Sequence, residues 1–273
     1  FKNWRMGLCM LLLSTLMVSE TFFWIQSEFP QGLAFMMVFF ALLTKSPELK
    51  DYNKLELLLF PIMIPVIVYF HPLIFIPFTF ICFFLFFRKT AIANKKLLVG
   101  SFFFFFFVKV LQQTVLKVHS HYESVAMGAL NNFKEFFPHY LTLDYNFQFL
   151  NCVGTDFYFL PIILILMTYW YGKQKNWFLI LLMWGFSFSY LILINVVHSK
   201  LKFLQFYMEN LYMPMALFAI IPFVFDFLPT RTAKQQIILI ATIAFIGIVR
   251  ISMSNDMFTP RLAWQRSLLE ETK

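Results

Sequence analysis

The chain has 273 residues, of which 60% are hydrophobic and 13% are charged, with 22 Lys and Arg against 14 Asp and Glu. Soluble globular proteins are about a quarter charged, so this sequence has too little polar surface to coat a water-soluble particle. The net charge of +8 is spread over the connections between apolar runs, which excludes a nucleic-acid-binding patch. The composition predicts an all-α, multi-pass integral membrane protein.

Nine apolar runs have the character of membrane-spanning helices. A spanning helix needs about 20 mostly apolar residues, with a range of about 17 to 25, and several of these runs are shorter. Only His71 and Pro72 separate the third run from the fourth, which predicts a tight helical hairpin or a re-entrant kink. We expect helices over residues 5–25, 31–45, 55–70, 71–87, 97–118, 157–171, 177–197, 211–229 and 236–253.

Lys and Arg gather in the connections that alternate along the chain. Short loops rich in Lys and Arg stay on the cytoplasmic side of a membrane. With nine spans, these connections fall on one side together with the N-terminus of this segment, so we expect that terminus to be cytoplasmic. Most acidic residues and all five His then fall in the extracytoplasmic loops. The basic connections are 45–54, 88–96, 172–176 and 230–236.

The two ends of the chain bear on its domain organisation. The sequence begins at Phe1 and ends at Lys273 in a helix-like run, so we expect it to be a fragment of a longer polypeptide. We predict a polytopic transmembrane domain over residues 1–253. Residues 254–273 are then the start of an extracytoplasmic segment.

Two carboxylates flank an aromatic segment that the topology assigns to the outer face. The segment SETFFWIQSEFPQG covers residues 19–32 and contains Glu20 and Glu28. Eight residues are about two helical turns, so both carboxylates would share roughly one face of a helix. The pair favours a general base, or a metal ligand, that faces a lipid-linked substrate. The alternative is an amphipathic connector with solvated acids.

A second candidate group precedes the eighth span, in HSKLKFLQFYMENLYMP. It contains Lys200, Lys202 and Glu209. Cations beside the outer leaflet suit the phosphate or pyrophosphate of a lipid carrier. Glu209 would lie near the membrane boundary, where ionisable groups are costly and tend to be functional. The alternative is ordinary charge at a helix end.

Two arginines near the end of the chain complete the candidate anion site. Arg250 lies at the outer end of the last span, and Arg261 follows Pro260 in the first turn of a new helix. Both side chains could reach a phosphate. In the alternative interpretation, Arg250 extends to the interface and Arg261 caps a surface helix.

The cofactor question stays open in the sequence. No metal-type cysteine spacing and no nucleotide-binding glycine pattern occurs. His119 and His121 could bind a divalent cation if their segment is extended, because alternate residues then share a face. We therefore assign no metal ligand and keep a divalent cation as the candidate cofactor. Cys9 and Cys82 lie in apolar runs, which predicts small buried hydrophobic residues.

Polar residues within two predicted spans need a different explanation. Lys109 and Gln113 are four residues apart and share a helix face. Lipid-facing placement of that face would be expensive, so it should meet other helices or a polar cavity. Asp226, near the inner end of its span, is predicted to be an interfacial residue.

The layout of the chain resembles that of polytopic glycosyltransferases of the GT-C type. The resemblance rests on short basic inner loops, SETFFWIQSEFPQG, the hairpin FHPLIF and the Y-x-E-N-x-Y-x-P entry to a late helix. The closing RLAWQRSLLEET is similar to the start of a soluble domain that such enzymes carry after their last helix. The resemblance implies an acidic base in an outer loop, a role that Glu20 or Glu28 would match, and a polyprenyl-phosphate sugar donor.

We therefore expect a glycosyltransferase of a bacterial inner membrane that moves a sugar from a polyprenyl-phosphate carrier to an extracytoplasmic acceptor. The carboxylate would accept the acceptor's proton, and basic side chains would stabilise the departing phosphate. The expected partners are membrane lipid and lipid-linked sugar, without nucleic acid. Two alternatives stay open: a transporter, and a non-enzymatic subunit of an envelope complex with other membrane proteins as partners. The basic residues expected at the phosphate are Lys200, Lys202, Arg250 and Arg261.

Overall fold

The computed structural model describes a helical protein, over residues 4–16, 28–70, 74–88, 92–115, 159–187 and 217–253. Every regular element in these ranges is a helix and none is a strand, which confirms the predicted all-α fold class. The predicted extracytoplasmic segment 254–273 lies outside them. The helices are α1 (Trp4–Leu16), α2 (Glu28–Leu43), α3 (Lys54–Phe70), α4 (Phe75–Phe87), α5 (Lys95–Thr114), α9 (Phe159–Lys173), Trp177–Ser187, Leu217–Thr230 and α12 (Ala233–Met253).

Polar caps, which an apolar run does not contain, fix where three of the helices begin. Asn53 and Glu56 form a reciprocal capping box at the start of α3, with N–H···O distances of 2.9 and 2.8 Å. Thr232 and Gln235 form the equivalent pair before α12. The Asn94 side chain accepts hydrogen bonds from the two amides that follow Lys95. As a result, α3, α5 and α12 begin one to three residues before the predicted runs.

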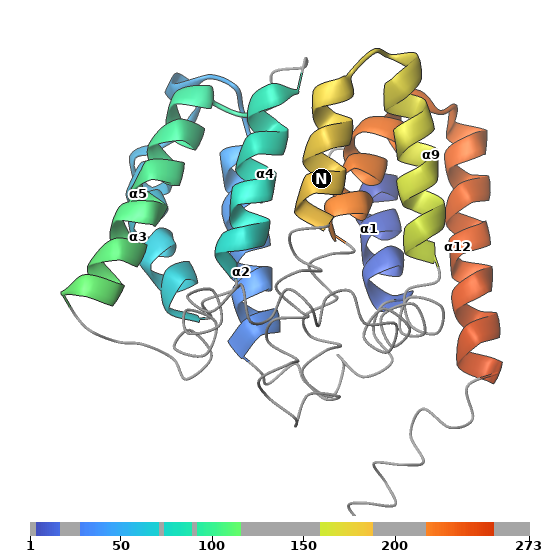
Figure 1. The fold of residues 1–273 in the computed structure, drawn as a ribbon, viewed down its shortest axis with the longest axis horizontal. Coiled ribbons are helices and arrows are strands. Elements are labelled where there is room, and N and C mark those ends of the chain that lie inside the picture. The colour runs from blue at the N-terminus through green and yellow to red at the C-terminus, as the bar shows by residue number, and fades with distance from the viewer. Residues whose placement is uncertain are drawn as a thin grey trace, which may run out of the picture.

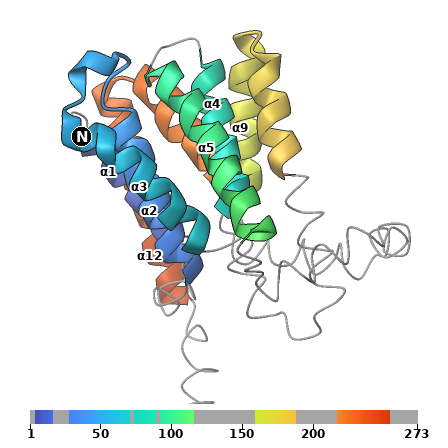
Figure 2. The same ribbon diagram turned by 90° about the vertical axis from the view of Figure 1, so that its left-hand side faces the viewer.

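The basic connections lie together at one end of a helical bundle (Figure 1). The view turned by 90° shows the same grouping, and the helices α2 to α5, α9 and α12 extend from that end toward the opposite one (Figure 2). The assignment of these connections to the cytoplasmic side of a membrane stays a prediction. We call this the basic end, comprising residues 44–53, 92–94, 174–176 and 231–232, and the opposite one the far end.

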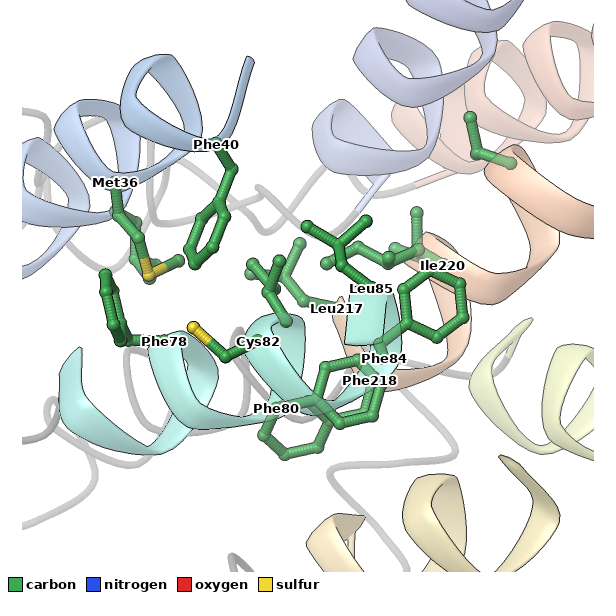
Figure 3. Packing of buried hydrophobic residues seen from close by; sticks show 14 of the residues in the cluster. Met36, Phe40, Phe78, Phe80, Cys82, Phe84, Leu85, Leu217, Phe218 and Ile220 are labelled. Carbon is green, nitrogen blue, oxygen red and sulfur yellow. The ribbon is translucent and has the colours of Figure 1, made fainter. Parts of the chain in front are cut away.

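Phenylalanine rings fill the centre of the bundle. Phe78 of α4 stacks on Phe105 of α5 with 4.2 Å between ring centroids, and Phe80 meets Phe218 at 4.7 Å. Cys82 lies in the same cluster, between α2 and the helix that carries Phe218 (Figure 3). Cys82, like Cys9 in α1, is a buried free thiol, as the apolar runs predict.

Large apolar side chains also cover the outside of the bundle. In α5, Phe103 and Phe107 are 66% and 61% exposed, and Val110 is 54% exposed. Within the described ranges, α5 is also the one helix long and apolar enough to cross a membrane by itself. A surface helix in water turns such a stripe toward the core. The bundle is therefore apolar on its outer surface as well as inside.

Gly32 lies where α2 passes the end of α3 and Ile74 just before α4, at an approach too close for a larger side chain. A Cβ atom there would lie 2.1 Å from Ile74 Cδ1 and 2.8 Å from Phe70 Cβ. The second atom is fixed to the backbone and cannot rotate away. We expect Gly32→Ala to lower the free energy of unfolding by about 1–3 kcal/mol, because the helices must move apart.

Gly100 of α5 is the matched control, because nothing lies within 4 Å of a Cβ built there. Gly100→Ala should keep or raise the melting temperature, since Gly destabilises a helix interior by about 0.5–1 kcal/mol relative to Ala. Thermal unfolding in detergent can be followed by dye labelling of buried Cys9 and Cys82 in a Cys152→Ser background. Equal melting temperatures for the two Ala variants would contradict the packing role of Gly32.

Candidate functional site

Of the predicted site residues, the structure describes the backbone of two. Glu28 is the first residue of α2, and Arg250 lies in the last turn of α12. Both positions lie at the far end, on separate helices (Figure 1). Their side chains lie outside what the structure describes, as do Glu20, Lys200, Lys202, Glu209 and Arg261 altogether.

Metal binding stays a prediction for the same reason. Among the residues that the structure describes, no group of three or more His, Cys, Asp or Glu could hold a metal ion. His119 and His121 lie outside those ranges. The candidate divalent cation is therefore neither supported nor contradicted by the fold.

A buried ion pair that the sequence pattern did not indicate lies next to the basic end. Arg88, directly after α4, pairs with Asp226 of the helix Leu217–Thr230. Arg88 Nη2 also donates a hydrogen bond to the Phe225 carbonyl oxygen at 3.0 Å. The Tyr171 hydroxyl of α9 donates to Asp226 Oδ2 at 2.7 Å. Three segments that are far apart in the sequence are thus joined at one carboxylate.

The surroundings of this pair strengthen its attraction and make it expensive to break. The side chains of Arg88 and Asp226 are 7% and 10% exposed, and the Phe84 ring covers the guanidinium at 5.3 Å from Cζ. Burial lowers the pKa of the Arg88 guanidinium, and the Asp226 carboxylate opposes that change. Arginine nevertheless stays charged at any physiological pH. A buried charge that loses its partner has no water to replace it.

A π-helical turn, Phe223–Phe227, turns Asp226 toward its partners. Such a turn holds one residue more than an α-turn and occurs frequently at functional sites. The rings of Phe223 and Phe227 stack at 5.3 Å along the turn, while the carboxylate meets Arg88 and Tyr171. Asp226 is therefore a largely buried ion-pair partner, while its predicted interfacial position, which is a depth in a membrane, stays a prediction.

A second polar network fastens the first and last described helices to the same segment. The buried Gln236 of α12 donates from Nε2 to the carbonyl oxygens of Leu228 and Arg231, at 3.1 and 3.0 Å. Arg5 of α1 donates from Nη1 to Gln236 Oε1 at 3.3 Å. These donors and acceptors are engaged in holding helices together, which is a structural role.

The polar face of α5 is partly covered, as its sequence predicts. Lys109 donates to Gln112 Oε1 at 3.2 Å, and Lys109, Gln112 and Gln113 are all half-buried. A lone lysine and two amides do not form a continuous polar path from one end to the other. This face therefore gives no support to the transporter alternative.

Comparison with known proteins assigns no family to the chain. No family model, no curated protein and no solved structure matches it.

Proposed function

We propose that the chain is an integral membrane protein that crosses the bilayer about nine times, with the basic end in the cytoplasm. The observation that carries this proposal is that Lys and Arg gather at one end of the bundle, while the rest of the described outer surface is apolar. Among the described residues, every Lys and Arg except Lys109 and Arg250 lies at or close to the basic end. The remaining outer surface exposes Phe, Val, Leu and Ile, which suits lipid.

Helix length supports the same proposal. The exposed helix α5 has 20 residues and is about 30 Å long, which matches the hydrocarbon thickness of a bilayer. The helix α4 has only 13 residues, but most of its side chains are buried against other helices. Of these two helices, α5 has the more exposed apolar surface and is also the one long enough to span a bilayer.

We further propose that the far end transfers a sugar from a polyprenyl-phosphate carrier to an extracytoplasmic acceptor. The acceptor oxygen would bond to the anomeric carbon while the bond from that carbon to the phosphate oxygen breaks. Glu20 or Glu28 would take the acceptor's proton. Polyprenyl phosphate would leave with its negative charge held by basic side chains, with Glu209 beside them. The proposed phosphate-binding residues are Lys200, Lys202, Arg250 and Arg261.

Two features support this assignment of the far end. Glu28 at the start of α2 and Arg250 in the last turn of α12 belong to the same end of the bundle, so the proposed base and a proposed phosphate-binding cation share that end. The polyprenyl chain would lie against the apolar outer surface, which brings its phosphate to the level of the helix ends. A bacterial inner membrane, where such carriers are used, is the proposed location.

Cysteine labelling in intact bacterial cells tests the orientation. In a Cys152→Ser background, Val115→Cys at the end of α5 should react with an impermeant maleimide, and Lys50→Cys should react only after the cells are opened. Both positions are exposed on the described surface. The reverse pattern would move the proposed chemistry to the cytoplasm. Equal reaction at both sites in intact cells would contradict membrane integration.

A transfer assay tests the activity. The purified chain, in liposomes that contain polyprenyl-phosphate sugars and an acceptor glycan, should release polyprenyl phosphate and lengthen the acceptor. Liposomes without protein are the control. If the chain is correctly oriented but no donor or acceptor pool supports transfer, the non-enzymatic envelope subunit becomes the better interpretation.

A further inference from the structure

Aromatic rings from two helices form a continuous exposed seam at the basic end. The Phe87 ring at the end of α4 lies 4.0 Å, between centroids, from the Phe178 ring of the helix Trp177–Ser187. Both rings remain partly exposed, at 41% and 44%. Lys95, the first residue of α5, holds its Nζ 5.2 Å from the centroid of the neighbouring Phe86 ring. A cation therefore stands at the border of the apolar seam.

Two more lysines, Lys173 at the end of α9 and Lys175 in the turn after it, shortly precede Phe178 in the sequence. Lys173 Nζ lies 4.5 Å from the Tyr169 ring centroid, and Lys175 takes a left-handed conformation with φ of 54°. That conformation is uncommon for a residue with a side chain. It closes the turn, and Trp177, which is 63% exposed, begins the next helix two residues after Lys175. We call Lys95, Lys173, Lys175, Phe87, Trp177 and Phe178 the lysine–aromatic patch.

The charge of this patch is not neutralised within the described part of the chain. None of its three lysines has a carboxylate within ion-pair distance there. The connection between α2 and α3, at the same end, is different: Lys45 pairs with Glu56, and Lys50 pairs with Glu48. Among the described residues, the patch is therefore a cationic surface without a carboxylate partner, and it borders on exposed aromatic rings.

We propose that the lysine–aromatic patch binds the phosphate headgroup of an anionic phospholipid in the leaflet at the basic end. The three ammonium groups attract the phosphate. Trp177 lies at the headgroup level, where amphipathic rings are favoured. The acyl chains lie along the seam of Phe87 and Phe178. This proposal deepens the proposed membrane location, on which it rests, and is independent of the transferase chemistry at the far end.

Lipid binding to a charge-matched pair of variants tests the proposal. The first variant combines Lys95→Gln, Lys173→Gln and Lys175→Gln. The control combines Lys50→Gln, Lys54→Gln and Lys234→Gln, which remove the same charge from the same end but outside the patch. We expect the first to weaken phosphatidylglycerol binding, measured by native mass spectrometry, by about 10- to 100-fold, since each lysine contributes attraction. The control should bind as the wild type does.

Three outcomes would overturn the proposal. Equal losses in both variants would show a diffuse surface potential instead of a site. Phosphatidylcholine binding as tightly as phosphatidylglycerol would remove the role of charge. Competition by soluble glycerol 3-phosphate at the same concentration would show a site for free phosphate. None of these affects the labelling of Lys50→Cys and Val115→Cys, so failure here and failure of the membrane topology are distinguishable.

Discussion

Replacing Glu20 or Glu28 with Gln should lower the rate of sugar transfer by about 10²- to 10⁴-fold at the position that holds the base, because an amide cannot accept the acceptor's proton. Gln keeps the size and much of the hydrogen bonding of Glu, so folding should be unaffected. The rate of polyprenyl-phosphate release in proteoliposomes measures the effect. At the other position, Gln should change the rate much less.

The carboxylate Glu48 provides the control for this pair. It is 57% exposed in an ion pair with Lys50 at the basic end, remote from the proposed chemistry. Glu48→Gln should transfer sugar at the wild-type rate. If both Glu20→Gln and Glu28→Gln also transfer normally while their melting temperatures are unchanged, the proposed base is wrong.

Asp226→Asn should destabilise the protein by about 3–5 kcal/mol, because it leaves the Arg88 guanidinium buried without a counter-charge. The substitution preserves the shape of the side chain, and the Tyr171 hydroxyl can still donate to the amide oxygen. The loss is therefore electrostatic. Thermal unfolding in detergent should show a large fall in melting temperature, and Lys50→Gln in the exposed Lys50–Glu48 pair should show little change.

A double replacement separates the loss of the pair from the loss of one partner. Arg88→Met combined with Asp226→Leu removes both charges, so no buried charge is left unpaired. Replacing a buried ion pair by apolar residues is often neutral or stabilising. We expect the double variant to regain most of the stability that Asp226→Asn loses. A double variant as unstable as the single one would show that the pair also fixes the local geometry.

The apolar runs of the sequence were sufficient to predict the helical class and the approximate positions of the helices. Residues 55–70 were predicted for α3, which covers Lys54–Phe70, because a run of this composition forms a helix in either a core or lipid. The helix starts were less accurate. Asn94 lies before the apolar run, and its contribution is a side-chain hydrogen bond to the backbone that hydropathy does not reveal.

The ion pair could not be predicted from the sequence. Arg88 donates a hydrogen bond to the carbonyl of Phe225, which is 137 residues away in the sequence. The sequence does not indicate which of the many basic residues in the inner connections pairs with Asp226. The one available signal was an acidic residue inside the run FVFDF, where an unpaired carboxylate would be expensive. The choice of Arg88 follows from the packing of α4 against the helix Leu217–Thr230, which only the fold determines.

The predicted site residues were chosen from chemistry, since connections lack the periodicity that identifies helices. The fold places the helix ends that carry Glu28 and Arg250 at the same end of the bundle. The predicted alternation of helix directions already implies this placement. The base and the phosphate-binding group therefore stay predictions that the Glu→Gln variants decide.

The additional residue in the π-helical turn sets the rotational register of the backbone after it. Each residue of an α-helix advances by about 100° around the axis, so deletion of one residue between Phe223 and Phe227 would swing the following turn by that angle. Leu228, Arg231 and Gln236 all follow this turn and would rotate together, so Gln236 would no longer face Arg5 of α1, which donates a hydrogen bond to it. The one additional residue in the π-helical turn thus links the orientation of the Asp226 carboxylate to the direction in which α12 continues.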